Sequence, residues 1–380
     1  MYSRLSTPMS HLNGSSIARS RVVIIGSGWA GYTLTQQLND SKYDITVISP
    51  HQTFQCTPLL ASAATGLFFS RLAEEPIRSA HRHLTYYRAL ATAADFDNKT
   101  VTCIPSSLNP ATGYDEPQPD ALFDVQYDKL VIAPGCQNQT FGTPGAEHCF
   151  FLKSVADADA IRRKILSLVE EASLPNVLEA RVRELLHFIV VGGGPTGIEL
   201  SAELDDLTTE LEKTYSHLRD KFSITVHDVA PEILGAFDRK LKEYAMGSLA
   251  RHGMEVKTNS HIERVEKGAI HTKEEGRIGC GLVAWVTGNK QTDFVGGLAG
   301  LAKADKTHRV LTDQRLRVLK EDRTVIEDVF ALGDMADILD KGLPATAEGA
   351  FGHLPRRPSG PLTFVTDCTF SQLLCRRPNG

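Results

Sequence analysis

An α/β fold with two Rossmann-like dinucleotide-binding domains, one inserted in the other, is predicted by a pattern that occurs twice. Each copy begins with an apolar, β-branched run, continues into a glycine cluster and enters a helix-like stretch. The copies are Arg21 to Ile25 followed by Gly26-Ser27-Gly28-Trp29-Ala30-Gly31, and His187 to Val191 followed by Gly192-Gly193-Gly194-Pro195-Thr196-Gly197. A lone glycine-rich turn would be weak evidence for dinucleotide binding. Here each turn stands between a strand and a helix, which is the context that the dinucleotide fingerprint requires.

The glycines have the same physical role in both copies. They allow a tight turn and a close approach of the backbone to a ligand. The helix that follows offers unpaired N–H groups and partial positive charge to a pyrophosphate. The chain is therefore expected to hold two dinucleotides at once.

The first unit has the order expected of a βαβ start. Its predicted elements are strands at 22–25, 44–48, 100–104 and 127–132 and a helix at 29–38. The segment from Asn109 to Asp120 is rich in Pro, Gly and Asp, and it is predicted to be an exposed loop between strands.

The second unit repeats this order after a helical stretch at 154–186. A charged helical segment at 205–221 precedes the strand 223–227, which ends at Asp228. Short strands at 283–286 and 329–332 end in Thr287-Gly288-Asn289 and Gly333-Asp334, and such strand ends are where ligands dock in open α/β sheets. The predicted domains are 21–153 with 290–350, and 154–289 inserted between them; residues 1–20 are expected to be a flexible or targeting segment and residues 351–380 a disordered tail.

Composition narrows the function classes. The chain has 380 residues, is 42% hydrophobic and carries a net charge of −5, so it lacks the basic field that nucleic-acid binding needs. Seven cysteines without C-x-x-C spacing argue against a zinc site, a disulfide framework or a redox pair, and no metal is expected. No apolar run approaches the roughly 18 to 20 residues of a membrane span.

Acidic residues at strand ends distinguish the two units. Asp228 stands where a carboxylate binds the adenosine ribose and repels a 2′-phosphate, so the second site should prefer NADH; the alternative is a solvated carboxylate. The first unit has Ser49 at the corresponding place and no acid. Asp334 after a late strand is typical of an FAD site, so FAD is assigned to the first unit; an N-cap role for Asp334 is the alternative.

Longer motifs resemble one family, the type II (alternative, non-proton-pumping) NADH:quinone oxidoreductases, fungal mitochondrial members in particular. The motifs lie between about residue 21 and residue 348. They are Val47 to Pro50 with Phe54 and Thr57-Pro58-Leu59-Leu60, Tyr86-Tyr87-Arg88-Ala89 with Ala91-Thr92, Phe141-Gly142, Pro144-Gly145, Phe151-Leu152-Lys153, Gly192 to Glu199, Trp285 with Thr287-Gly288-Asn289, and Phe330 to Asp334.

The resemblance implies the architecture of FAD/NAD(P)-binding flavoprotein disulfide reductases and an enzyme that passes hydride from NADH to flavin and two electrons to a quinone. It implies that Glu199 is catalytic, beside nicotinamide and flavin; a carboxylate placed only by the dipole of the first helical turn is the alternative. The implied FAD residues are Gly26, Gly28, Ser49, Pro50, Thr57, Ala91, Gly135 and Asp334; the implied NADH residues are Gly192, Gly194, Glu199, Asp228 and Gly288; Trp29, Ala30, Pro195 and Ala347 complete the candidate cofactor-binding set.

The sequence departs from the family after Ala347. The family has two glutamines where this chain has Glu348 and Gly352, and Pro355 would end the helix of the quinone site. The alternatives are therefore a flavoprotein of the same fold with another acceptor, or an inactive fragment without the quinone site. The resemblance implies the periphery of the mitochondrial inner membrane, with a cytoplasmic location as the alternative, and a homodimer is also considered.

Overall fold

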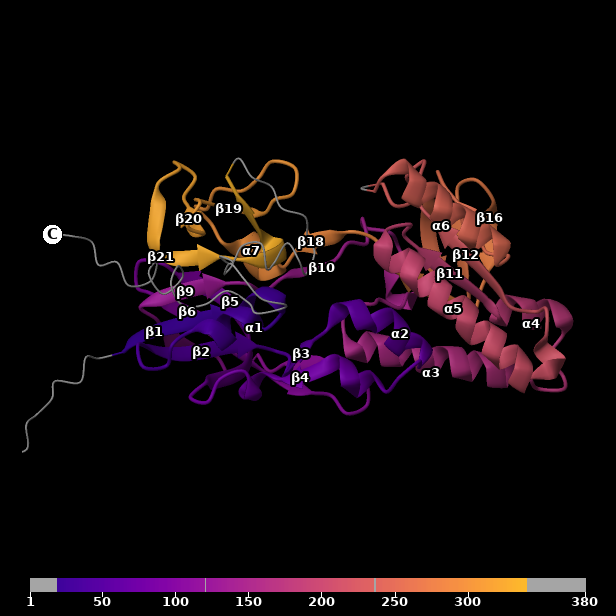
Figure 1. The fold of residues 1–380 in the computed structure, drawn as a ribbon, viewed down its shortest axis with the longest axis horizontal. Coiled ribbons are helices and arrows are strands. Elements are labelled where there is room, and N and C mark those ends of the chain that lie inside the picture. The colour runs from indigo at the N-terminus through magenta and orange to yellow at the C-terminus, as the bar shows by residue number, and fades with distance from the viewer. Residues whose placement is uncertain (1–18, 120, 236, 340–380) are drawn as a thin grey trace, which may run out of the picture.

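The computed structural model describes residues 19–119, 121–235 and 237–339. Almost all of the predicted N-terminal segment and all of the predicted tail lie outside these residues, as do Ala347, Glu348 and Gly352. Figure 1 shows two sheets side by side, with the early and late parts of the chain in one and the middle of the chain in the other. The inserted arrangement predicted from sequence agrees with this layout.

The larger sheet has a parallel centre, in the order β21-β9-β1-β2-β5. Val22 and Ile24 of β1 pack into one core cluster, and Val23 and Ile25 pack into another on the opposite face. Burial on both faces explains the continuous apolar run in this strand. The strands are β1 (Ser20–Ile25), β2 (Tyr43–Ser49), β5 (Thr85–Asp95), β6 (Thr100–Leu108), β7 (Asp115–Pro117), β8 (Phe123–Gln126), β9 (Lys129–Ile132), β19 (Val310–Thr312), β20 (Arg317–Leu319), β21 (Val325–Ala331) and β22 (Ala336–Ile338).

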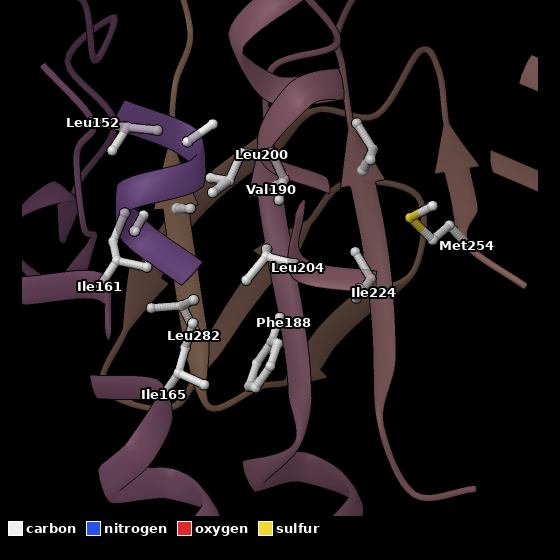
Figure 2. Packing of buried hydrophobic residues seen from close by; sticks show 14 of the residues in the cluster. Leu152, Ile161, Ile165, Phe188, Val190, Leu200, Leu204, Ile224, Met254 and Leu282 are labelled. Atoms are coloured by element: carbon white, nitrogen blue, oxygen red, sulfur yellow. The ribbon is translucent and has the colours of Figure 1, made fainter. Parts of the chain in front are cut away.

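The smaller sheet is wholly parallel, in the order β13-β12-β11-β17. Phe188 and Val190 of β11 face the helices (Figure 2), whereas Ile189 and Val191 face a three-stranded antiparallel sheet. The parallel strands are β11 (His187–Val191), β12 (Ser223–His227), β13 (Glu255–Lys257) and β17 (Leu282–Trp285), and the antiparallel strands are β14 (Ile262–Glu266), β15 (Ala269–Thr272) and β16 (Gly276–Gly279).

Two short strands, β10 (Cys136–Asn138) and β18 (Asn289–Gln291), carry the chain between the sheets and pair with each other in antiparallel orientation. A second antiparallel pair joins β3 (Thr53–Gln55) to β4 (Glu74–Pro76). Helix α2 (Leu60–Thr65) comes from the first part of the chain, yet it packs into the core beside the smaller sheet. The predicted domain boundaries remain a proposal, and by its packing α2 belongs with the second unit.

The helices follow the predicted pattern with one rearrangement. The charged segment from Asp205 is not a separate helix, because α5 (Pro195–Thr214) is a single helix of 20 residues that begins at the second glycine turn. The other helices are α1 (Trp29–Gln37), α3 (Val155–Ala172), α4 (Glu179–Leu185), α6 (Arg239–Arg251) and α7 (Asp293–Gly297), and the 3₁₀ turns are η1 (Thr57–Leu59), η2 (Ser70–Ala73), η3 (Ile77–Ser79), η4 (Ala146–His148), η5 (Ser216–Leu218) and η6 (Gly333–Met335).

The segment predicted as an exposed loop at 109–120 is partly a strand. Residues Asp115–Pro117 form β7, which pairs with β6 at the edge of the larger sheet. The prediction was wrong here because Pro, Gly and Asp mark the turn but do not exclude backbone pairing beyond it. The side chain of Asp115 is only 13% exposed.

We expect a buried histidine to make the second unit sensitive to acid. His227 is fully buried on β12; its Nδ1 contacts the Ser260 hydroxyl at 2.8 Å, and its Nε2 has no hydrogen-bond partner among the described residues. Burial, with the nearby Lys257 charge, lowers the pKa of His227 to about 4. The folded protein therefore favours the neutral ring, whereas the unfolded chain takes up a proton near pH 6.5.

We expect the contribution of His227 to stability to be complete above about pH 6.5 and to be lost as the pH falls towards 4. The shift corresponds to a loss of about 3 kcal/mol. Urea unfolding of His227→Gln should show a weaker dependence on pH in this range, whereas exposed His217→Gln should behave as the wild type. An identical pH dependence in all three proteins would contradict the assignment.

Candidate cofactor sites

The first glycine turn connects β1 to α1 with very close backbone contacts. Gly26 has φ +99°, and a Cβ on it would overlap the carbonyl oxygen of Ala133. A Cβ on Gly31 would likewise overlap the carbonyl oxygen of Gly26. Gly28 occupies the N-cap of α1 and has no side chain to cap the helix, and the space beside its Cα is open. Such a helix start is suited to an anionic group.

The second turn repeats this geometry between β11 and α5. Gly192 has φ +119°, and a Cβ on Gly197 would overlap the carbonyl oxygen of Gly192. Gly194 is the N-cap and faces open space, and Pro195 is the first helical residue, where its missing N–H costs nothing. Both fingerprints therefore form the strand, turn and helix start that the sequence predicts.

Several predicted FAD residues gather around the first turn. The Ser27 hydroxyl donates to the Ser49 hydroxyl at 2.8 Å, and both side chains are buried. The Trp29 indole Nε1 donates to the Thr57 hydroxyl at 2.9 Å. A Cβ on Gly333 would lie 3.2 Å from the Cβ of Ala30, so the turn that carries Asp334 adjoins this turn as well.

Other predicted residues lie farther along the same sheet. Pro50 follows β2 directly, and its carbonyl oxygen accepts a hydrogen bond from Nε of Arg88 at 3.2 Å. Ala91 is half-buried on β5, where it pairs with Cys103 of β6. Gly135 has φ +72° between β9 and β10. These residues lie on neighbouring elements of the larger sheet.

Asp334 belongs to a polar chain that the sequence did not reveal. It lies within η6, whose N-cap is Leu332, so the N-cap alternative for Asp334 is wrong. The Cys136 thiol donates to Oδ2 of Asp334 at 3.3 Å, and Lys153 Nζ donates to Cys136 Sγ at 3.1 Å and to Oδ1 of Asn289 at 2.5 Å. Burial outweighs the nearby Lys153 charge and raises the pKa of Cys136, so the thiol stays protonated.

Asp228 contacts the second glycine turn directly. Its Oδ2 accepts the N–H of Gly193 at 2.5 Å, and its Oδ1 accepts the N–H of Ala230 at 2.7 Å. The strand register places His227 beside Val191, so the carboxylate lies at the carboxyl edge of the sheet. The half-buried, hydrogen-bonded carboxylate differs from the alternative of a solvated strand end.

Gly288 reaches the same edge from β17. The carbonyl oxygen of Gln139 accepts hydrogen bonds from the Trp285 indole at 3.0 Å and from the Thr287 hydroxyl at 2.9 Å, which fixes the end of this strand. A Cβ on Gly192 would lie 3.1 Å from the backbone nitrogen of Thr287. Gly192, Asp228 and Gly288 therefore converge at one edge.

Glu199 is the fifth residue of α5, in the second turn of the helix. The alternative of a carboxylate held by the dipole of the first turn is therefore wrong, because no acidic residue stands in that turn. The residue is largely exposed, yet partial burial of its carboxyl group and the neighbouring Glu203 raise the pKa of Glu199. Glu203 accepts hydrogen bonds from the hydroxyls of Ser62 at 2.6 Å and Thr65 at 3.3 Å, which ties α5 to α2.

The family model for pyridine nucleotide-disulphide oxidoreductases matches residues 20–353. The chain belongs to this family. Among its relatives are the external alternative NAD(P)H-ubiquinone oxidoreductase B2 of Arabidopsis thaliana, 35% identical over 91% of this chain and 59% of the relative, and a probable NADH dehydrogenase of Dictyostelium discoideum, 35% identical over 89% and 72%.

A solved structure agrees with the family assignment. The NDH2 of Plasmodium falciparum in complex with NADH superposes with a TM-score of 0.76 at 27% identity, over 84% of this chain and 65% of that chain. By name, these relatives are NAD(P)H-ubiquinone oxidoreductases and an NADH dehydrogenase, which agrees with the family that the sequence motifs resemble, and the fold predicted from sequence is confirmed. The chain spans about three fifths of the length of its plant relatives.

Neither a metal-binding cluster nor a membrane-spanning helix is found in the part of the chain that the structure describes. Among residues 19–339, apart from 120 and 236, no group of His, Cys, Asp and Glu side chains could hold a metal ion. None of the helices in the same residues is long and apolar enough to cross a bilayer. Sequence reasoning missed the polar residues Asp115, Cys136 and Glu203, and it noted Arg88 and Lys153 only as parts of longer motifs. Their contacts are all with residues of other elements.

Proposed function

We propose that this protein is an FAD-dependent NADH dehydrogenase that passes electrons to a quinone without pumping protons. The observation that carries the proposal is that two glycine turns of the same geometry have different polar side chains beside them. Asp228 binds the backbone of the second turn, whereas the Ser49 hydroxyl bonds to the first. A carboxylate at this place favours NADH over NADPH.

The residues present fit both dinucleotides. Gly28 and Gly194 leave open space at two helix starts, where backbone N–H groups can bind a pyrophosphate. Gly333, directly before Asp334, adjoins the first turn, and Thr287, directly before Gly288, adjoins the second. FAD held there would supply the acceptor for a hydride from NADH and the donor of two electrons to a quinone, so the chemistry would belong to the cofactor and the protein would supply alignment.

A series of polar contacts from Asn289 through Lys153 and Cys136 to Asp334 supports the proposal that the two sites are adjacent. Asn289 lies two residues after Thr287, and Asp334 directly follows Gly333, so these polar contacts extend from the neighbourhood of one glycine turn to that of the other. Lys153 contributes a positive charge at this junction. Such alignment is the main contribution that a protein makes to hydride transfer between two bound cofactors.

Glu199 is the proposed catalytic residue. Its raised pKa makes it able to hold or release a proton closer to neutral pH than an ordinary glutamate. Hydride transfer and quinone reduction both change the proton count of the bound groups, and a nearby carboxyl group can balance it.

The acceptor and the cellular site rest on the relatives. The Arabidopsis relatives are named NAD(P)H-ubiquinone oxidoreductases of mitochondria, which supports a quinone acceptor and a mitochondrial location for this chain. We further propose peripheral association with the inner membrane, where a lipid-dissolved quinone is reached, and assembly as a homodimer.

The test is anaerobic single-turnover reduction of the bound flavin by NADH, followed by reoxidation with ferricyanide or a short-chain quinone. Replacing Glu199 by glutamine should slow flavin reduction or quinone reoxidation by about a hundredfold, because a proton donor is lost. Glu210→Gln, an exposed change on the same helix, is the matched control. Wild-type rates in Glu199→Gln would remove Glu199 from the site, and oxidation by ferricyanide without oxidation by quinone would refute the quinone acceptor for this chain.

A further inference from the structure

The carboxyl edge of the larger sheet carries a set of charged residues beside the first glycine turn. In the parallel register, Ile25 lies beside Ile48 and Ser49 lies beside Arg88. The glycine turn, Ser49 and Arg88 therefore lie at one edge of the sheet. The end of the second strand is where a dinucleotide-binding unit contacts an adenosine ribose.

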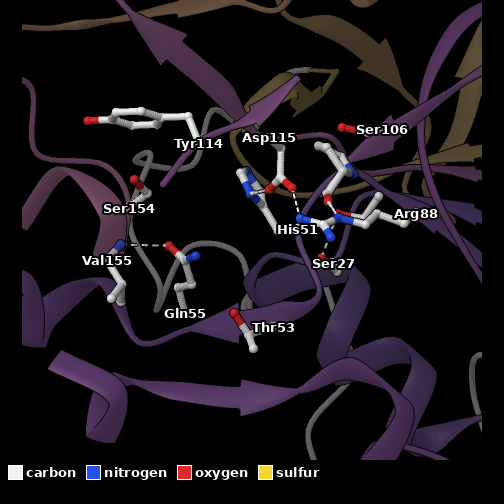
Figure 3. A network of polar contacts seen from close by, with 12 residues as sticks. Ser27, His51, Thr53, Gln55, Arg88, Ser106, Tyr114, Asp115, Ser154 and Val155 are labelled. Carbon is white, nitrogen blue, oxygen red and sulfur yellow. Dashed lines mark hydrogen bonds and ion pairs between the residues drawn. The ribbon is translucent and has the colours of Figure 1, made fainter. Parts of the chain in front are cut away.

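Asp115 reaches this edge from β7 (Figure 3). Its carboxylate forms an ion pair with the Arg88 guanidinium and accepts a hydrogen bond from His51 Nδ1 at 3.1 Å. The side chains of Asp115 and Arg88 are 13% and 21% exposed, whereas that of His51 is 51% exposed. Burial opposes ionisation, but hydrogen bonds from His51 and Arg88 lower the pKa of Asp115, so it carries a full negative charge at neutral pH.

The backbone around this ion pair is fixed at several points. The Tyr86 hydroxyl contacts the carbonyl oxygens of Ser49 at 3.0 Å and His51 at 2.7 Å. On the other side, the Tyr114 hydroxyl donates to Oδ1 of Asp157 at 2.9 Å, at the capped start of α3. The hairpin that carries Asp115 is thus held both to the sheet edge and to α3.

These contacts leave hydrogen-bonding groups of His51 and Arg88 for a ligand. Nδ1 of His51 contacts the carboxylate, which leaves Nε2, an acceptor whenever the ring is neutral, for a ligand. The Arg88 guanidinium has five N–H donors in a fixed planar arrangement. Its Nε donates to the Pro50 carbonyl and one terminal nitrogen donates to Asp115, so other N–H donors remain. An acceptor and several donors are the groups that ribose hydroxyls and an adenine ring require.

We infer that Asp115 is a positioning residue for the adenosine half of FAD, holding Arg88 and His51 at the ribose edge of the first site. The inference rests on the proposed function, which assigns FAD to this unit. In the second unit, Asp228 supplies the acid from the end of its own strand. In the first unit, a hairpin formed much later in the sequence supplies it.

The test compares FAD with FMN, which lacks the adenosine half. The flavin-stripped full chain is titrated with each flavin by fluorescence, for the wild type, Asp115→Asn and the control Asp124→Asn, an exposed change on β8. Asp115→Asn should raise the Kd for FAD by about tenfold to a hundredfold and leave the Kd for FMN unchanged, because a charge-assisted network is weakened only at the adenosine half.

A second variant keeps the inference testable if Asp115→Asn unfolds the hairpin. His51→Gln leaves the ion pair in place and should also weaken FAD more than FMN, although by less. Equal weakening of FAD and FMN, or unchanged FAD binding in a folded Asp115→Asn protein, would overturn the inference. Failure of the wild type to bind FAD would instead refute the proposed function.

Discussion

Asp228→Asn should lower kcat/KM for NADH by about tenfold to a hundredfold, the effect expected when charged hydrogen bonds to a ribose are lost. The preference for NADH over NADPH should shrink at the same time, because the carboxylate no longer repels a 2′-phosphate. Asparagine keeps the shape of the side chain and one acceptor oxygen near the Gly193 N–H. Steady-state kinetics with both nucleotides, with ferricyanide as acceptor, provide the measurement.

The matched control for this prediction is Asp206→Asn, an exposed change on α5. It should leave both values of kcat/KM unchanged. If Asp228→Asn retained the NADH preference of the wild type, Asp228 would have no role in choosing the nucleotide, and its hydrogen bonds to Gly193 and Ala230 would only stabilise the turn.

Gly197→Val should abolish most NADH binding while FAD stays bound. A Cβ at Gly197 overlaps the carbonyl oxygen of Gly192, so α5 must move away from the turn, and displacements of about 1 Å can cost about a hundredfold in rate. Gly31→Val should instead lose FAD and keep NADH binding, because a Cβ at Gly31 overlaps the carbonyl oxygen of Gly26 in the first turn. FAD content and NADH affinity, measured on both variants, separate the two sites.

The same outcome in both variants would contradict this assignment. Loss of FAD from Gly197→Val, in a protein that remains folded by circular dichroism, would mean that the second turn serves the flavin. Retention of flavin reduction by NADH in Gly197→Val would mean that the close contact at Gly197 is not needed for nucleotide binding.

The sequence predicted the parts of the fold that depend on local patterns. The glycines of both turns, the buried strands β1 and β11 and the helix starts of α1 and α5 follow from residues next to one another, and their forms are confirmed. The long helix α5 was only partly predicted, because its charged second half was read as a separate segment. The packing of α2 beside the second sheet was missed, since nothing near Leu60 indicates a partner so far along the chain.

The polar contacts around the predicted residues could not be predicted from sequence. Cys136 meets Asp334 across 198 positions, and Ser62 meets Glu203 across 141. Such pairs exist only after the sheets have formed and brought distant strand ends together. Asp115 was hidden for another reason, because it lies in a segment whose composition predicts a loop. Its function depends on the β6–β7 pairing, which places it near Arg88.

We propose that one chain holds an FAD site and an NADH site next to each other. Anaerobic addition of one equivalent of NADH to the purified, FAD-loaded chain tests it most directly, with the visible flavin absorption as the readout. We expect rapid and complete bleaching by NADH and much slower bleaching by NADPH. Bound flavin that NADH leaves oxidised would mean that the two sites do not exchange electrons.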